Sequence, residues 1–391
     1  MKSLVDIDIS NKNLVVRVDM NVPIRDKKIQ DPTRIKACLP TINYALEKNC
    51  KVLLISHLGR PTEGSVEDKY SLAPVSEYLS DILDEPVSLE KDISNTEIFK
   101  SGPRVKVLEN IRFYKGEKNN SSELGKSLGL LGDVYVFDAF GTSHRKQAST
   151  YEAIIKSKES CAGFLLKNEV EALNKSLQNP PKPNLAIIGG AKVSSKLGLI
   201  NNLKDKTDFI IVGGGITNTF LKASGHEVGS SLVEDSMLDI AREILESGKV
   251  LLPSRVIVSS TLEGANIAEK SIYEISAHEL ILDQALTEDM KQAIKKSKLI
   301  LWNGPLGVFE NELFSKGTRD LSKHISESQG FSIAGGGETL SAINTFINKD
   351  DVSYCSTGGG AFLEFMEGKK LPSIEALESK YLDQETKNET Y

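Results

Sequence analysis

The sequence is poor in cysteine, and its cysteines are not paired. It has four, at positions 38, 50, 161 and 355, and no two of them form a CxxC pair. This spacing excludes a disulfide scaffold and a zinc site built from cysteines, and it is typical of a reducing compartment. The sequence also lacks any apolar run that approaches 18 residues, so we expect no membrane-spanning segment. The first ten residues already carry charged side chains and predict no signal peptide, which favours a cytoplasmic protein with no membrane partner.

Charge of one sign is not in strong excess either. The chain has 48 basic and 54 acidic residues, a net charge of −6, which argues against nucleic acid as a partner. What is present is ordinary globular composition: 391 residues, 39% of them hydrophobic, which is enough for two or three domains with their own cores.

Short β-branched runs alternate with longer segments of helical periodicity along the whole chain. This alternation predicts βαβ units, and therefore an α/β protein with parallel, doubly wound sheets. The strands are expected at 14–18, 52–55, 105–108, 134–137, 185–188, 209–212, 256–258, 299–302, 331–334 and 352–355.

A helix and a proline-rich break predict the domain boundary. Residues 167–178 have helical spacing, and Asn179-Pro180-Pro181-Lys182-Pro183 then ends the helix. We expect domains at 1–166 and 185–370, joined by a connector at 167–184.

Glycine clusters mark the second half. They occupy 189–190, 213–215, 335–337 and 358–360, each after a predicted strand. Ligands of open α/β sheets bind at the carboxyl ends of strands, and glycine lets the backbone approach a phosphate closely. One cluster alone would be explained as a tight turn, but four of them favour phosphate or nucleotide binding. Neither the P-loop pattern nor the dinucleotide GxGxxG pattern is present in the expected context.

Two lysines follow the first cluster. If a helix begins there, Lys192 and Lys196 share one face and suit a transferring phosphoryl group. The alternative, two solvated helix lysines, is about equally favoured by this segment alone. Glu310, after the strand at 299–302, could accept hydrogen bonds from ribose hydroxyls, although surface charge is the simpler interpretation.

Polar and basic residues follow the strands of the first half. Seven of the ten arginines precede residue 150. If the strands are parallel in one sheet, His57, Arg60, Arg112 and Arg145 converge at one edge. Such a cluster is typical of a site for a small anion with phosphate and carboxylate groups, although each arginine alone would more often be a surface ion pair.

These segments resemble phosphoglycerate kinases. The resemblance covers nearly the whole chain and lies in nine motifs in the family's order, namely RVDMNVP (17–23), SHLGRP (56–61), LENIRF (108–113), DAFGTSHR (138–145), GGAKVSSK (189–196), GGG (213–215), WNGPLGVFE (302–310), GGGET (335–339) and STGGGA (356–361).

The resemblance implies two Rossmann-like domains with a cleft between them, a monomer, and a C-terminal segment, 371–391, that packs on the N-terminal domain. It implies catalytic roles for Arg34, Lys192, Lys196 and the amides of 358–360, Gly359 among them. It implies that 3-phosphoglycerate is held by Asp19, Asn21, Arg34, His57, Arg60, Arg112 and Arg145. It implies that Mg-ADP or Mg-ATP is held by Lys196, Gly214, Asn303, Glu310, Gly336, Gly337, Glu338 and Thr339.

The implied reaction is the reversible transfer of a phosphoryl group from 1,3-bisphosphoglycerate to ADP, in glycolysis and gluconeogenesis. The acceptor in the reverse direction is a carboxylate, which is already ionised at neutral pH, so no general base is needed. Charge neutralisation and alignment are needed instead, which agrees with a sequence rich in basic strand ends.

One departure from the family pattern concerns the metal. The family usually has aspartate after the glycines of the third cluster, and this chain has Glu338. Magnesium demands near-ideal octahedral geometry, so the longer side chain is expected to keep activity while weakening or shifting Mg²⁺ binding.

Two other functions remain open from the sequence. A dinucleotide-dependent oxidoreductase would share the fold class, but the missing fingerprint and the arginine-rich first half speak against it. A relative that binds nucleotide without turnover is supported only by Glu338.

Overall fold

The computed structural model describes residues 1–95 and 97–388, and the side chains of 176 and of 382–388 are not described. Its internal contacts divide the chain into two compact units. Unit 1 contains residues 1–171 and 370–388, and unit 2 contains residues 172–369. The division falls inside one helix, α5 (Phe164–Leu177). Of the predicted C-terminal segment, 371–391, residues 389–391 lie outside the described residues.

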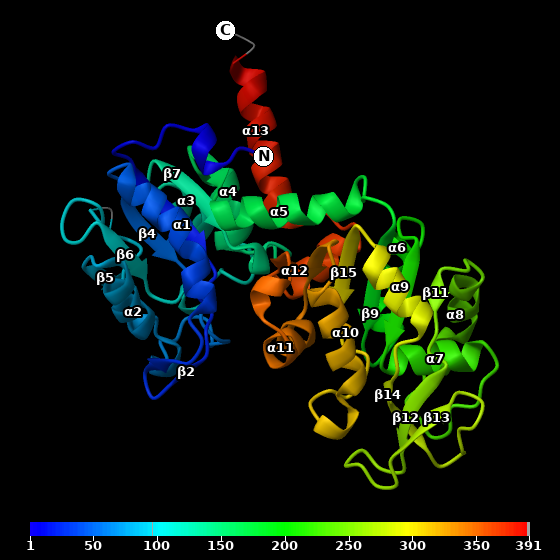
Figure 1. The fold of residues 1–391 in the computed structure, drawn as a ribbon. Helices are drawn as coiled ribbons and strands as arrows, with labels where there is room; N and C mark the ends of the chain where they lie inside the picture. Colours follow the sequence, from blue (N-terminus) through cyan, green and yellow to red (C-terminus); the bar gives the residue numbers. More distant parts are fainter. Residues whose placement is uncertain (96, 389–391) are drawn as a thin grey trace. The chain divides into compact units, whose positions relative to one another are not determined.

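Unit 1 is built on a six-stranded sheet whose strands all run parallel (Figure 1). Its order is β5-β6-β4-β1-β7-β8. The strands are β1 (Asn13–Val18), β4 (Lys51–Ile55), β5 (Val87–Glu90), β6 (Val105–Leu108), β7 (Val134–Asp138) and β8 (Glu159–Ala162). The helices are α1 (Thr33–Glu47), α2 (Ala73–Leu83), α3 (Ser122–Gly129), α4 (Ala153–Lys156) and α13 (Pro372–Asn388), and a short hairpin pairs β2 (Ile24–Arg25) with β3 (Lys28–Ile29).

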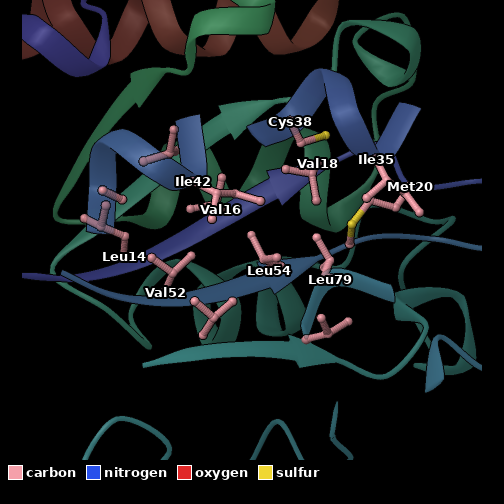
Figure 2. Packing of buried hydrophobic residues seen from close by; sticks show 14 of the residues in the cluster. Leu14, Val16, Val18, Met20, Ile35, Cys38, Ile42, Val52, Leu54 and Leu79 are labelled. Atoms are coloured by element: carbon pink, nitrogen blue, oxygen red, sulfur yellow. The ribbon is translucent and has the colours of Figure 1, made fainter. Parts of the chain in front are cut away.

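Alternate residues of the central strands face opposite sides of this sheet. Leu14, Val16 and Val18 of β1 pack against α1 and α2, with Ile42 and Leu79 among their neighbours (Figure 2). Because side chains alternate along a strand, Arg17 points to the other face. The apolar runs seen in the sequence are therefore explained by strands that helices cover on both sides.

Unit 2 repeats the parallel architecture with the order β11-β10-β9-β15-β16-β17. The strands are β9 (Asn184–Gly189), β10 (Phe209–Gly213), β11 (Val250–Leu251), β15 (Leu299–Asn303), β16 (Phe331–Ala334) and β17 (Tyr354–Cys355). The helices are α6 (Leu197–Leu203), α7 (Gly215–Ala223), α8 (Leu238–Leu245), α9 (Glu288–Lys296), α10 (Lys316–Ser326), α11 (Gly337–Phe346) and α12 (Gly360–Met366). The predicted fold class, two doubly wound parallel-sheet modules, is confirmed.

Some strand predictions need correction. The segment 256–258 lies in β12 (Arg255–Ser259), the middle of a separate antiparallel sheet with β13 (Ala268–Ser271) and β14 (Leu280–Gln284). The last predicted strand, 352–355, shortens to Tyr354–Cys355. The sequences of β5, VSLE, and β8, ESCA, are too polar and short to show the pattern of a buried strand, so they were not predicted.

The helix predicted at 167–178 begins three residues earlier, at Phe164. Tertiary partners accept its first amides: Thr41 Oγ1 accepts from Phe164 N at 3.0 Å, and Asp138 Oδ1 accepts from Leu166 N at 3.0 Å. Helix N-termini need such acceptors, and here they come from distant segments. The C-terminal α13 is tied to unit 1, where Ser373 N donates to Ser143 O at 3.1 Å.

No helix among the residues that the structure describes is long and apolar enough to cross a membrane.

Candidate active site

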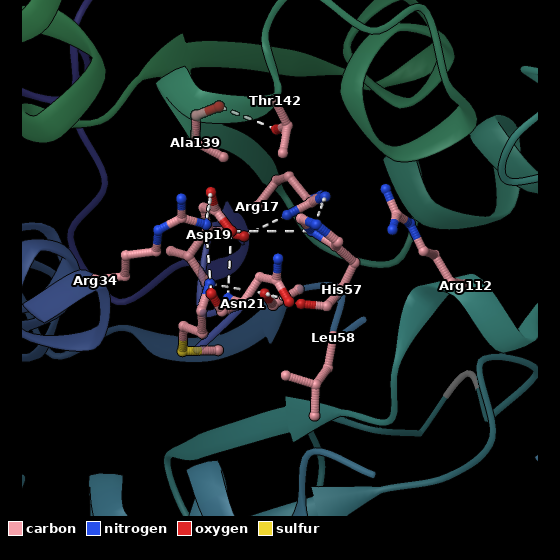
Figure 3. A network of polar contacts seen from close by, with 12 residues as sticks. Arg17, Asp19, Asn21, Arg34, His57, Leu58, Arg112, Ala139 and Thr142 are labelled. Carbon is pink, nitrogen blue, oxygen red and sulfur yellow. Dashed lines mark hydrogen bonds and ion pairs between the residues drawn. The ribbon is translucent and has the colours of Figure 1, made fainter. Parts of the chain in front are cut away.

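The basic cluster of unit 1 forms where the central strands end. Because these strands are parallel, the segments after β1, β4, β6 and β7 come to the same edge of the sheet. They carry Asp19 and Asn21, His57 and Arg60, Arg112, and Arg145, while Arg34 comes from the first turn of α1. Figure 3 shows Asp19, Asn21, Arg34, His57 and Arg112 of this group. The strand order reverses between β1 and β7, which is where open α/β sheets place their ligands.

Asp19 is the carboxylate inside this cluster. Its Oδ2 accepts from Arg34 Nη1 at 3.1 Å, and its Oδ1 accepts from Asn21 N at 3.2 Å. The Arg34 side chain is 39% exposed whereas that of Asp19 is 9% exposed, so the guanidinium reaches from solvent to a nearly buried partner. Asn21 in turn accepts from Gly59 N through Oδ1 at 2.9 Å, which links the loops after β1 and β4.

Positive charge is concentrated here beyond what the protein neutralises. Burial, with repulsion from Arg145 and Arg17, lowers the pKa of Arg112 to about 10. Burial also lowers the pKa of Arg145, with Arg17, Arg60 and Arg34 acting in the same direction. Arg112 Nε is buried without a hydrogen-bond partner among the described residues. A bound anion with several oxygens would relieve this repulsion and provide acceptors.

His57 is neutral in this environment. It is buried, and burial, followed by repulsion from Arg17 and Arg112, holds its pKa well below the usual 6.5. A neutral imidazole has one N–H donor and one acceptor nitrogen. His57 can therefore donate a hydrogen bond without adding to the charge of the cluster.

Two residues of this site were not predicted from the sequence. Arg17 is buried within β1 and lies 3.4 Å through Nη2 from His57 Nδ1. Asn110 is buried after β6, and its Nδ2 donates to Leu58 O at 2.7 Å while its Oδ1 accepts from Leu58 N at 3.2 Å. Two features of the sequence could have identified these residues. Arg17 stands between valines in an apolar strand, and Asn110 belongs to a polar pair, Glu109-Asn110, at a strand end.

In unit 2 the glycine clusters lie at the carboxyl ends of β9, β10 and β16, and the fourth follows β17 after two residues. Gly214 and Gly336 have φ of 64° and 98°, and each directly precedes a helix, α7 and α11. A pocket in this region is lined by residues that include Gly190, Gly214, Gly215, Leu232, Glu310 and Glu338.

Lys196 and Asn303 form a chain of hydrogen bonds that ends at the glycine cluster 335–337. Lys196 Nζ donates to Asn303 Oδ1 at 2.6 Å, and Asn303 Nδ2 donates to Gly335 O at 2.6 Å. Burial lowers the pKa of Lys196, while Glu338 acts in the opposite direction. Thr339 is buried, and its hydroxyl accepts from Gly304 N and donates to Gly335 O, both at 2.8 Å. The Thr339 side chain therefore holds the glycine loop in place.

The condition for a shared face of Lys192 and Lys196, a helix that begins directly after the first glycine cluster, is not met. Residues 190–193 are irregular, a short 3-10 turn covers Ser194–Lys196, and α6 begins only at Leu197. Glu234 accepts from Ser194 N at 2.8 Å, a tertiary contact that shapes this loop. Because Lys192 lies outside any helix, it does not share a helical face with Lys196, and its side chain is exposed. Gly358 N donates to Ser356 Oγ at 3.1 Å, so one of the amides expected to face a phosphoryl group is engaged within its own loop.

A group of three or more His, Cys, Asp or Glu side chains that could hold a metal does not occur in the described part of the chain. Glu338 is an exposed carboxylate in the first turn of α11 and lines the pocket of unit 2. Proteins commonly hold Mg²⁺ through one or two carboxylates together with the phosphates of a substrate, and Glu338 beside the glycine loop is a single carboxylate of this kind.

Comparison with known proteins identifies the family of this chain. The family model for phosphoglycerate kinase matches residues 4–369. The phosphoglycerate kinase of Psychrobacter sp. (strain PRwf-1) is 50% identical over 392 residues, with 96% of this chain and 97% of that protein covered. The one from Francisella philomiragia is 48% identical over 386 residues, with 97% and 98% covered.

Solved structures give the same result. The phosphoglycerate kinase of Coxiella burnetii has a TM-score of 0.90 at 44% identity, and that of Pyrococcus horikoshii has a TM-score of 0.80 at 31% identity. Both comparisons cover 97% of this chain and 99% of the other. The basic strand ends of unit 1, the glycine loops of unit 2 and these relatives together show that the chain belongs to the phosphoglycerate kinase family.

Proposed function

We propose that unit 1 binds the phosphoglycerate and unit 2 binds the nucleotide of a reversible phosphoryl transfer from 1,3-bisphosphoglycerate to ADP. The observation that carries the proposal is the cluster of arginines around Asp19 and neutral His57, which has more positive charge than the protein itself balances. A small molecule with one carboxylate and one phosphate supplies that balance. Its proposed ligands are Asp19, Asn21, Arg34, His57, Arg60, Arg112 and Arg145.

The nucleotide is proposed to bind at the glycine loops of unit 2. Gly214, Gly336 and Gly337 let the phosphates approach the backbone, and helix α11 directs its N-terminus to the same place. Lys196 and Asn303 contribute side chains, Glu310 is available to the ribose, and Thr339 supports the loop. We propose that Glu338 meets Mg²⁺ carried by ADP or ATP, where the ion would neutralise phosphate charge.

The residues suit transfer between oxygens without proton abstraction. The acceptor carboxylate is ionised at neutral pH, so the protein has to align the reactants in line and stabilise charge on the moving phosphoryl group. We propose that Arg34, Lys192, Lys196 and the amide of Gly359 do this. Transfer requires both bound substrates to meet, and hinge bending at the connector 167–184 between domains 1–166 and 185–370 is our prediction for how they do so.

The cellular setting follows from the same proposal. We infer a glycolytic enzyme that works in the cytoplasm as a monomer, because each of the two substrates has a site within one chain. No nucleic-acid partner is proposed, in line with the net charge of −6.

The test is ATP-dependent phosphorylation of 3-phosphoglycerate, coupled to NADH oxidation, across a Mg²⁺ titration. Turnover of about ten per second or more, the usual enzyme range, is the expected result. Folded protein that binds nucleotide and shows no turnover would overturn the proposal in favour of a non-catalytic relative.

A further inference from the structure

The Arg17 side chain connects the anion site to a buried hydrogen-bond network. This network lies on the face of the sheet away from Leu14, Val16 and Val18. Arg17 Nε donates to Ser149 Oγ at 2.9 Å, and Arg17 Nη1 donates to Val18 O. Ser149 lies in a single π-helical turn, Ala148–Glu152, a rare geometry that is often found at functional sites. The network therefore begins at the strand end and runs into the helical layer.

Glu117 completes the network. Its Oε1 accepts from Ser149 Oγ at 2.6 Å, and its Oε2 accepts from Ser149 N at 2.9 Å. Glu117 and Ser149 are both fully or almost fully buried. The Ser149 hydroxyl accepts a hydrogen bond from Arg17 and donates one to Glu117, so the hydroxyl proton points toward Glu117. Since buried charged groups are costly unless they are paired, this geometry holds the Arg17 guanidinium in one place.

The fixed guanidinium decides which nitrogen of His57 carries the proton. A guanidinium has only donors, so a hydrogen bond between Arg17 Nη2 and His57 Nδ1, which lie 3.4 Å apart, requires an unprotonated Nδ1 (Figure 3). The competing acceptor for an Nδ1 proton is Asp19 Oδ1, which lies 3.9 Å away, beyond hydrogen-bond distance. The proton of neutral His57 is then on Nε2.

We propose that Glu117 and Ser149 are positioning residues, which hold Arg17 so that His57 keeps its Nε2–H tautomer and donates that proton to the bound anion. The inference rests on the proposed function of unit 1 for the identity of the anion. The tautomer itself is a property of the free protein and does not depend on that identity.

The experiment is a two-dimensional ¹H–¹⁵N spectrum of the histidine side chains in the full-length, substrate-free protein. The chain has five histidines, so the His57 signals are assigned by their loss in His57→Asn. We expect an unprotonated Nδ1 and a protonated Nε2 in the wild type. A protonated Nδ1 would overturn the proposal, whether or not any variant folds.

The variant Ser149→Ala removes the link between Glu117 and Arg17. We expect mixed His57 tautomers and a KM for 3-phosphoglycerate raised about tenfold, with the KM for Mg-ATP unchanged. Glu117→Gln, which keeps an acceptor oxygen, should lie between the wild type and Ser149→Ala. The matched control is Ser160→Ala, because Ser160 Oγ is buried in the same sheet without a hydrogen-bond partner among the described residues.

The outcomes separate the two proposals. A wild type without turnover, but with the expected His57 spectrum, contradicts only the proposed function. Normal turnover combined with an unchanged spectrum and unchanged KM in Ser149→Ala contradicts only the positioning role.

Discussion

Arg34 is a partly exposed arginine of the anion site that pairs with the nearly buried carboxylate of Asp19 at 3.1 Å. If it stabilises charge on the transferring phosphoryl group, as arginine fingers do in other phosphotransferases, Arg34→Ala should lower turnover by a factor on the order of 10³. Steady-state kinetics of the coupled reaction measure this. Arg25→Ala, at an arginine whose side chain is 84% exposed, is the control, and a loss below tenfold in Arg34→Ala would refute the proposed role.

Glu338 is the carboxylate that we propose meets Mg²⁺ in unit 2. The carboxylate stands in the first turn of α11, one methylene longer than aspartate. Because Mg²⁺ tolerates little distortion of its octahedral shell, Glu338→Asp should lower the Mg²⁺ concentration for half-maximal rate several-fold. The exposed Glu327→Asp serves as control. An unchanged Mg²⁺ dependence in Glu338→Asp would remove Glu338 from the metal site.

Asp283 on β14 gives unit 2 a pH dependence of stability. Its Oδ2 accepts from Gly317 N at 2.7 Å, whereas Oδ1 is buried without a hydrogen-bond partner in the described residues. Burial raises its pKa from 3.8 to about 7. The folded state then binds a proton that the unfolded state has lost, so this contribution to stability is present below pH 4 and disappears as the pH rises through 7.

Replacing this carboxyl with an amide removes the titration. Asp283→Asn should raise the melting temperature relative to wild type more at pH 8 than at pH 5, which calorimetry at the two pH values measures. Asp239→Asn, at a side chain 95% exposed, should show no such difference. An equal shift for Asp283→Asn at both pH values would contradict the ionisation argument.

At the scale of elements, the ends of β9, β10 and β15 meet without room for side chains. A Cβ added at Gly189 would overlap the carbonyl of Pro305, and one added at Gly304 would overlap the backbone of Gly189. Gly189→Ala is therefore expected to cost about 1–3 kcal/mol and to lower the melting temperature by about 5 °C.

A second glycine of the same unit provides the comparison. Gly337 has open space around its Cβ position and lies at the start of α11, so Gly337→Ala should leave the melting temperature unchanged or slightly raised. Equal destabilisation by the two substitutions would show that glycine is needed at these positions for its backbone conformation. The close packing of neighbouring backbone segments would then not be the reason.

At the scale of the whole molecule, the two ligands are assigned to different units. Hydrogen exchange with 3-phosphoglycerate alone should protect amides in 19–21, 57–60 and 110–113 of unit 1. Mg-ATP alone should protect 189–191, 213–215 and 335–338 of unit 2. The amides of helix α8 (Leu238–Leu245) serve as the internal reference, and neither ligand should change their protection. Protection of the opposite set by either ligand would reverse the assignment.

Much of the parallel architecture was accessible from the sequence because each buried strand is a local apolar run. The segments 105–108 and 331–334 coincide with β6 and β16. Because parallel strands end at a common edge, the sequence also predicts that His57, Arg112 and Arg145 lie at one edge of the sheet. Segments without that local signal, such as β5 and β8, were missed.

The sequence by itself determined the family, the fold class and the residue types at the strand ends, because these depend on local patterns and short motifs. Only the tertiary structure decided which groups are buried and paired. It placed Arg17 against His57 through a register between distant strands, bound Ser194 of the loop that carries Lys192 to Glu234, and set the start of α5 through Thr41 and Asp138. Desolvation and hydrogen bonding between distant segments produce these features, and neither is encoded in any single window of the chain.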